Sequence, residues 1–191
     1  MLSVAKSSFV RKKTILRMRL KGEEKQFWWH FAQIKDSNDI PAEVSGIAGV
    51  DDPDFNDNYL AMLTDRVKVV HSIYLKETAV TDEGVQHISK IRQLKSLTLM
   101  KHPNITKTSL PLLNQLTDLE YLDIWRTGIV LEDLIALNQL KNIKKIFVSS
   151  LRESESGTFP ELENEQILEH LIILEDIFPD CTFYVDHKEY L

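Results

Sequence analysis

The chain of 191 residues contains one cysteine, Cys181, which excludes an intramolecular disulfide and a cysteine-based zinc site. No apolar run approaches the roughly 18 residues that are needed to cross a bilayer. An excess of basic residues is also absent: the chain has 23 lysines and arginines and 29 acids, which gives a formal net charge of -6. We therefore expect no membrane insertion and no nucleic-acid binding, which depends on a basic surface. Cys181 is expected to be a buried hydrophobe.

The common catalytic and nucleotide-binding motifs are missing as well. The sequence has no G-x-S-x-G, no H-E-x-x-H, no P-loop and no G-x-G-x-x-G. The six histidines are dispersed, and the acidic stretch DDPDFND at 51–57 lacks the glycine and the twelfth-position glutamate of a calcium loop. We expect no catalytic residue, no cofactor and no metal site.

The middle of the chain does contain a recurring pattern of apolar residues. An alternating apolar pair returns at steps of 24, 25 and 24 residues, as Ile73 and Leu75, Leu97 and Leu99, Leu122 and Ile124, and Ile146 and Val148. Apolar residues at every third position follow the first three pairs, as in Val85, Ile88 and Ile91. A weaker copy begins at Val44 and Ile47, with Gly49 in place of the second apolar residue. Each unit is therefore predicted to be a strand followed by a short helix.

One of these units, VHSIYLKETAVTDEGVQHISKIRQL, resembles the leucine-rich repeat consensus LxxLxLxxTxITDxGLxxLxxLxxL. The resemblance covers roughly residues 44–151 and implies an α/β solenoid, with parallel strands on its concave face and short helices on its convex face. Many such repeats carry an asparagine or cysteine at the positions that are Thr78, His102 and Thr127 here, so hydroxyls would replace the asparagine ladder in two units. Thr81 or Asp82 is expected to cap the helix that follows.

The segments that flank the repeats are expected to cap them within one structural domain. The predicted parts are an N-terminal cap at 1–43, about four repeats at 44–151, and a polar loop with a helix–strand cap at 152–191. In the last part, a helix ends before Pro179 and CTFYVD forms the final strand.

The N-terminal cap leaves two interpretations open. The alternating sequence TILRMRL at 14–20 predicts a half-buried strand. QFWWHFAQI at 26–34 fits either the second strand of a hairpin or a helix that starts near Glu23. In a strand, Trp28, Trp29 and Phe31 could not all be buried on one face.

Side chains that alternate with the apolar pairs would line the concave face. Its central outward row is Ala48, Tyr74, Thr98, Asp123, Phe147 and Tyr184. Aromatic residues with a charged rim have the composition of protein-binding hot spots. The predicted protein-binding residues are Tyr74, Met100, Tyr121, Asp123, Trp125, Arg126, Phe147 and Tyr184. The alternative is that a flanking loop or the C-terminal cap covers Phe147 and Tyr184.

The sequence therefore predicts a non-enzymatic protein-binding module whose rigid concave face holds a protein partner. One alternative is a bacterial immunity protein or effector inhibitor that neutralises a basic toxin; another is an enzyme with its active site around Trp28, Trp29 and His30. Met1–Lys21 contains seven basic residues and no acid, like a mitochondrial transit peptide. A mitochondrial assembly factor in the matrix is therefore a further alternative to a cytoplasmic protein.

Overall fold

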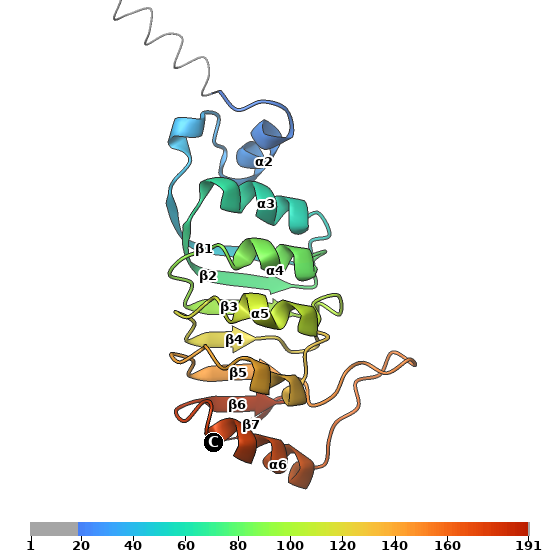
Figure 1. The fold of residues 1–191 in the computed structure, drawn as a ribbon. Coiled ribbons are helices and arrows are strands. Elements are labelled where there is room, and N and C mark those ends of the chain that lie inside the picture. The colour runs from blue at the N-terminus through green and yellow to red at the C-terminus, as the bar shows by residue number, and fades with distance from the viewer. Residues whose placement is uncertain (1–18, 191) are drawn as a thin grey trace, which may run out of the picture. The chain divides into compact units, whose positions relative to one another are not determined.

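The computed structural model describes residues 19–190 as an α/β protein with two compact units, which meet in the sequence between Ala42 and Glu43 (Figure 1). The first unit contains helix α2 (Gly22–Ala32) and the 3-10 helix η1 (Ser37–Asp39). Most of the strand expected at 14–20 lies outside the described residues.

The helix in the first unit shows that the hairpin interpretation of 26–34 is wrong and that the helical one is confirmed. Helical spacing brings Phe27, Trp28 and Phe31 together, with ring centroids 4.9 Å apart for Phe27 and Trp28 and 5.5 Å apart for Trp28 and Phe31. Trp28 is fully buried, whereas Trp29 is 42% exposed. His30, the histidine of the enzyme alternative, is exposed on the same helix.

The second unit is built on one seven-stranded sheet whose strands follow one another in chain order. The strands are β1 (Glu43–Val50), β2 (Val69–Lys76), β3 (Ser96–Met100), β4 (Tyr121–Asp123), β5 (Lys145–Val148), β6 (Thr182–Val185) and β7 (Lys188–Tyr190). The first six are parallel, and β7 is antiparallel to β6.

Helices lie on one face of this sheet (Figure 1). They are α3 (Asp57–Arg66), α4 (Asp82–Ile88), the 3-10 helix η2 (Lys107–Ser109) with α5 (Leu110–Leu113), the 3-10 helix η3 (Leu131–Ala136), and α6 (Asn164–Glu175). The later connections are shorter and tighter than the helices expected there. Glu132 and Asp133 lie in the first turn of η3, and the Asp133 side chain accepts a hydrogen bond from the backbone N–H of Val130.

The residues that the sequence aligned are the residues that pair in the sheet. Ile73 pairs with Leu97, Leu97 with Leu122, and Leu122 with Ile146. All four are fully buried. The irregular Gly49 has a steric reason, because a Cβ at this position would lie 2.8 Å from the Phe55 ring. The aromatic side chain of Phe55 therefore takes the space of the missing apolar residue.

The C-terminal segment contains one strand more than the sequence predicted. CTFYVD forms β6, but it is not the last strand, because β7 folds back on it. The turn between them contains Asp186 and His187, both with positive φ (47° and 69°). Two left-handed residues are typical of the tight turns that join antiparallel strands, where glycine is the usual signal. No glycine marks this turn in the sequence.

Carboxylates link successive helix starts. Asp57 accepts hydrogen bonds from the backbone N–H and the hydroxyl of Thr81 at 2.9 and 2.7 Å. Asp82 accepts the equivalent pair from Thr106 at 2.8 and 2.7 Å, and a further one from the Ser109 hydroxyl. The cap of α4 is Thr81, whose hydroxyl accepts from the N–H of Glu83. Asp82 therefore links its own strand–helix repeat to the next repeat, and it does not cap α4.

Two of the turn residues compared with the consensus, His102 and Thr127, bond to the backbone in different ways. The buried His102 accepts a hydrogen bond from the backbone N–H of Thr78 through Nε2 at 3.2 Å. Burial lowers the pKa of His102 and favours the neutral ring that can act as acceptor. The Thr127 hydroxyl accepts from the N–H of Ile129 and donates to the carbonyl of Ile124. At Thr127 the hydroxyl therefore bonds to the backbone on both sides of the turn.

Replacing Gly84 with alanine is expected to lower the free energy of unfolding by about 1–3 kcal/mol. Alanine normally stabilises a helix interior, but a Cβ at Gly84 would lie 2.5 Å from Val80 Cγ1 and 3.0 Å from Leu60 Cδ1. Urea unfolding measures the change. Gly46→Ala is the matched control, since its nearest neighbour would be 3.6 Å away. Equal stabilities for the two variants would contradict the prediction.

Candidate functional site

The face of the sheet opposite the helices, called the open face below, holds the predicted site residues. Its central row runs across five strands in register: Tyr74, Thr98, Asp123, Phe147 and Tyr184. A parallel row contains Ser72, Ser96, Tyr121 and Lys145. Strand alternation places both rows on the same face, because their positions differ by two residues.

Three aromatic side chains from neighbouring strands contact one another on the open face; we call them the aromatic ladder. The Tyr121 and Phe147 ring centroids are 5.3 Å apart. Phe147 and Tyr184 stack with centroids 4.2 Å apart and an interplanar angle of 2°. All three are half-buried. The sheet therefore presents a continuous aromatic surface at β4, β5 and β6.

A second group, called the arginine stack below, forms where the chain leaves β4. The Arg126 guanidinium carbon lies 4.3 Å from the Trp125 ring centroid and 4.5 Å from that of Phe159. The His187 ring centroid is 4.2 Å from that of Trp125. Phe159 belongs to the loop after β5 and His187 to the β6–β7 turn. The alternative from the sequence is that a flanking loop or the C-terminal cap covers Phe147 and Tyr184; the contacts of Phe159 and His187 are with Arg126 and Trp125.

Asp123 is predicted from the sequence to be an exposed binding residue, yet it is only 4% exposed. Thr98, its neighbour in the central row, is also buried at 3%. The short β4 ends at Asp123, whose Oδ1 accepts a hydrogen bond from the Trp125 N–H at 3.0 Å. Desolvation raises the pKa of Asp123 to about 6, and the nearby His187 opposes that shift. Asp123 therefore lies beneath the surface of the open face.

The remaining predicted residues lie toward β2 and β3. Tyr74 is 41% exposed and Met100 is half-buried. At the adjacent strand ends, Lys101 and Glu77 form an ion pair at 2.5 Å. The eight predicted residues thus share one face, and the structure brings five of them into two contact groups: Tyr121, Phe147 and Tyr184, and Trp125 with Arg126. Phe159 and His187 complete the second group and carried no sequence signal, because nothing in their local spacing relates them to β4.

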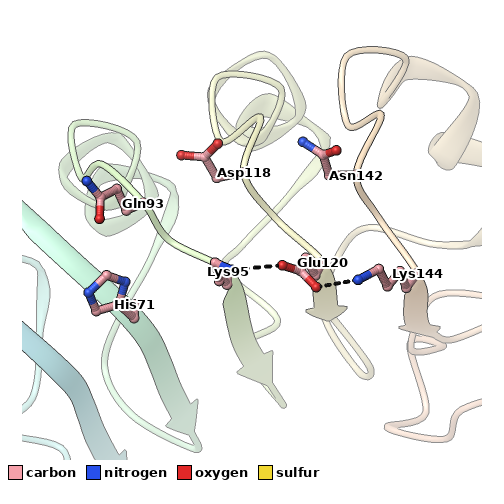
Figure 2. Close-up of a pocket in the computed structure, with 7 residues that line it drawn as sticks. All are labelled: His71, Gln93, Lys95, Asp118, Glu120, Asn142 and Lys144. Carbon is pink, nitrogen blue, oxygen red and sulfur yellow. Dashed lines mark hydrogen bonds and ion pairs between the residues drawn. The ribbon is translucent and has the colours of Figure 1, made fainter.

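A polar hollow of about 420 Å³ lies at the amino-terminal ends of β2 to β5 (Figure 2). Its side chains come from successive strand starts and the loops before them: His71, Gln93, Lys95, Asp118, Glu120, Asn142 and Lys144. Glu120 forms ion pairs with Lys144 at 2.6 Å and Lys95 at 3.2 Å, and these lysines lower its pKa. The charges at the centre of the hollow are therefore paired between neighbouring strands. This pairing is enough to explain these three residues as structural.

No protein-family model and no curated protein matches this chain. The candidate site is therefore judged on its geometry. Within residues 19–190, no group of three or more histidine, cysteine, aspartate or glutamate side chains could hold a metal ion. In the same range, no helix is both long and apolar enough to cross a membrane. Cys181 is buried as expected, and burial raises the pKa of its thiol to about 12.

A separate apolar patch lies on α6. Leu168, Ile172 and Ile173 are 44%, 68% and 54% exposed. The helix and the turn after it contain Glu165, Glu169, Glu175, Asp176 and Asp180, with no lysine or arginine. This patch is the natural comparison surface for any test of the open face, because it is exposed and apolar but lacks aromatic residues.

Proposed function

We propose that the chain is a leucine-rich repeat solenoid that binds a protein partner through its open face and catalyses no reaction. The observation that carries the proposal is the aromatic ladder, with the arginine stack beside it, on the sheet face opposite the helices of the second unit. Tyrosine, tryptophan and arginine are the residues that contribute most to protein-binding hot spots.

The in-register pairing supports the repeat part of the proposal. Partner residues in adjacent parallel strands are 24 or 25 positions apart from β2 to β5, as the consensus requires. Side chains held on such strands lose little conformational freedom when a partner docks. The rings of Phe147 and Tyr184 already stack on each other in the absence of a partner.

The charges at the open face argue against a basic toxin as the partner of this surface. Lys145 is exposed, with its ammonium 6.0 Å from the Tyr184 ring centroid, and Arg126 adds a second cation. A basic partner would bring like charges together, which lowers affinity.

Site-specific photo-cross-linking tests which face is used. A photoreactive phenylalanine analogue at Tyr74 on the open face is expected to cross-link the partner in native lysate. The same analogue at Ile135, which is 53% exposed in η3, is the control on the helical side. Cross-links from Ile135 but not from Tyr74 would overturn the proposal.

Side-chain truncation tests which residues hold the partner. The variant Tyr121→Ala/Trp125→Ala is expected to lose the protein that the native chain retains, with at least about a 30-fold loss of affinity, since hot-spot truncations cost about 2 kcal/mol or more. The matched control Leu168→Ala/Ile172→Ala removes apolar area from the α6 patch and is expected to retain the partner. Thermal melting verifies that both variants are folded.

A further inference from the structure

Arg126 stands out among the charged residues at the carboxyl ends of the strands. Asp51, Glu77, Lys101 and Arg126 occupy equivalent positions, and all four are left-handed with φ between 51° and 60°. The backbone N–H of each donates to the next unit: Asp51 to Lys76 O, Glu77 to Met100 O, Lys101 to Trp125 O, and Arg126 to the Ser149 hydroxyl. These contacts fix a row of side chains along one edge of the sheet.

The first three members of this row interact with one another. Lys101 pairs with Glu77 at 2.5 Å, and this lysine lowers the pKa of Glu77. A hydrogen bond with Glu77 raises the pKa of Asp51. Arg126 follows in the row, next to Lys101, which has a like charge. Among residues 19–190, no carboxylate forms an ion pair with Arg126 and no side chain or carbonyl accepts a hydrogen bond from its guanidinium.

The surroundings of Arg126 exclude water from part of its guanidinium without supplying an acceptor. The rings of Trp125 and Phe159 both lie over the guanidinium, at 4.3 and 4.5 Å from its central carbon. Its Nε is buried and has no hydrogen-bond partner among the described residues. A charged group that is partly desolvated and unpaired gains strongly from an anion. The stacked plane also holds the terminal N–H groups in one orientation, which lowers the entropy cost of binding.

We propose that Arg126 is the binding site for a carboxylate side chain, Asp or Glu, of the protein partner. This inference rests on the proposed function and names the chemistry of the group that docks beside the aromatic ladder. The planar fork of the guanidinium matches the two oxygens of a carboxylate. A phosphate dianion carries two negative charges and Arg126 neutralises one of them, while Lys101 is already paired with Glu77 and Arg152 with Glu132 and Asp133.

The probe is a random displayed peptide library, selected on the full chain and followed by synthesis of the enriched peptides. We expect enrichment of Asp or Glu close to apolar residues. Arg126→Gln is expected to weaken the selected peptides about 10- to 100-fold, and the peptide's own Asp→Asn or Glu→Gln change to do the same. Combining the two changes is expected to add little further loss, which identifies them as partners.

Two variants of the chain serve as controls. Lys145→Gln removes one positive charge from the same face, and its effect is expected to stay within about threefold, since an exposed charge contributes little. Arg126→Lys keeps the charge but lacks the flat fork, so an intermediate loss is expected. Thermal melting of Arg126→Gln and Arg126→Lys verifies the fold of both.

The outcomes separate this inference from the proposed function. Peptides that cross-link at Tyr74 but show no acidic residue and no dependence on Arg126 would overturn the carboxylate site and leave open-face binding intact. Displacement of the selected peptides by inorganic phosphate at concentrations where acetate has no effect would overturn the choice of carboxylate. An empty selection also overturns it, and the proposed function then depends on the cross-linking result alone.

Discussion

Replacing Asp82 with alanine is expected to lower the free energy of unfolding by about 2–4 kcal/mol. The carboxylate accepts hydrogen bonds from the backbone N–H and hydroxyl of Thr106 and from the Ser109 hydroxyl, and Ser109 is fully buried. Alanine would leave these donors without an acceptor between two packed strand–helix repeats. A buried donor without an acceptor costs more free energy than its hydrogen bond contributes. Chemical denaturation measures the loss, and amide exchange at Thr106 is expected to become faster.

Glu83→Ala is the matched control for this effect. Glu83 is the adjacent acid in the first turn of α4 and is exposed, so its removal is expected to cost less than about 1 kcal/mol through the helix dipole. Asp82→Asn keeps one acceptor oxygen and should fall between the two. If Asp82→Ala and Glu83→Ala had the same free energy of unfolding, the link between repeats through Asp82 would contribute no net stability.

Replacing Asp123 with asparagine is expected to raise the free energy of unfolding at neutral pH by up to about 3 kcal/mol. Burial raises the pKa of Asp123 from 3.8 to about 6, so ionisation is more costly in the folded state than in the unfolded one. The folded state therefore binds more protons between these two pH values, and the stability that Asp123 contributes is lost as pH rises through about 6. Asparagine has no such loss and retains an acceptor for the Trp125 N–H.

The test compares unfolding free energies of the native chain and Asp123→Asn from about pH 4 to pH 7.5. We expect the difference to be largest at the upper end and to fall steeply toward pH 4, where the folded carboxyl is protonated and the unfolded one is close to its pKa of 3.8. The lowered pKa of His102 acts in both proteins and cancels in the difference. Asp118→Asn, an exposed aspartate in the polar hollow, is the control. A pH-independent difference would refute the raised pKa of Asp123.

The strand order and much of the pairing were predictable because they depend on spacing. Ile73, Leu97, Leu122 and Ile146 have the same place in their units, and each pairs with the next across parallel strands. The expectation of an α/β protein is confirmed by the sheet and its helices. The turn at Asp186 and His187 was missed since its left-handed residues carry no glycine, and β7 was missed with it.

The sequence predicted which face of the sheet holds the candidate site, but it did not predict how deeply each side chain is buried. Alternation placed Tyr74, Asp123 and Phe147 in one row, and the strands keep that row. Alternation says which way a side chain leaves the strand, but it does not say what covers it. Asp123 is buried even though it lies in the outward row. Of the two candidate caps of α4, Thr81 is confirmed. The link made by Asp82 was not predicted, because its partners lie in the next strand–helix repeat and a local capping rule considers only one helix.

The sequence by itself determined the α/β class, the register of β2 to β5 and the face on which the aromatic residues gather. Each of these follows from a short repeating pattern of apolar side chains. Only the tertiary structure decided that Phe159 and Trp125 enclose the Arg126 guanidinium and that His187 lies against Trp125. These residues come from a loop, a strand end and a turn outside any common period. Their contacts depend on where the folded sheet places those segments, and a linear pattern does not encode that placement.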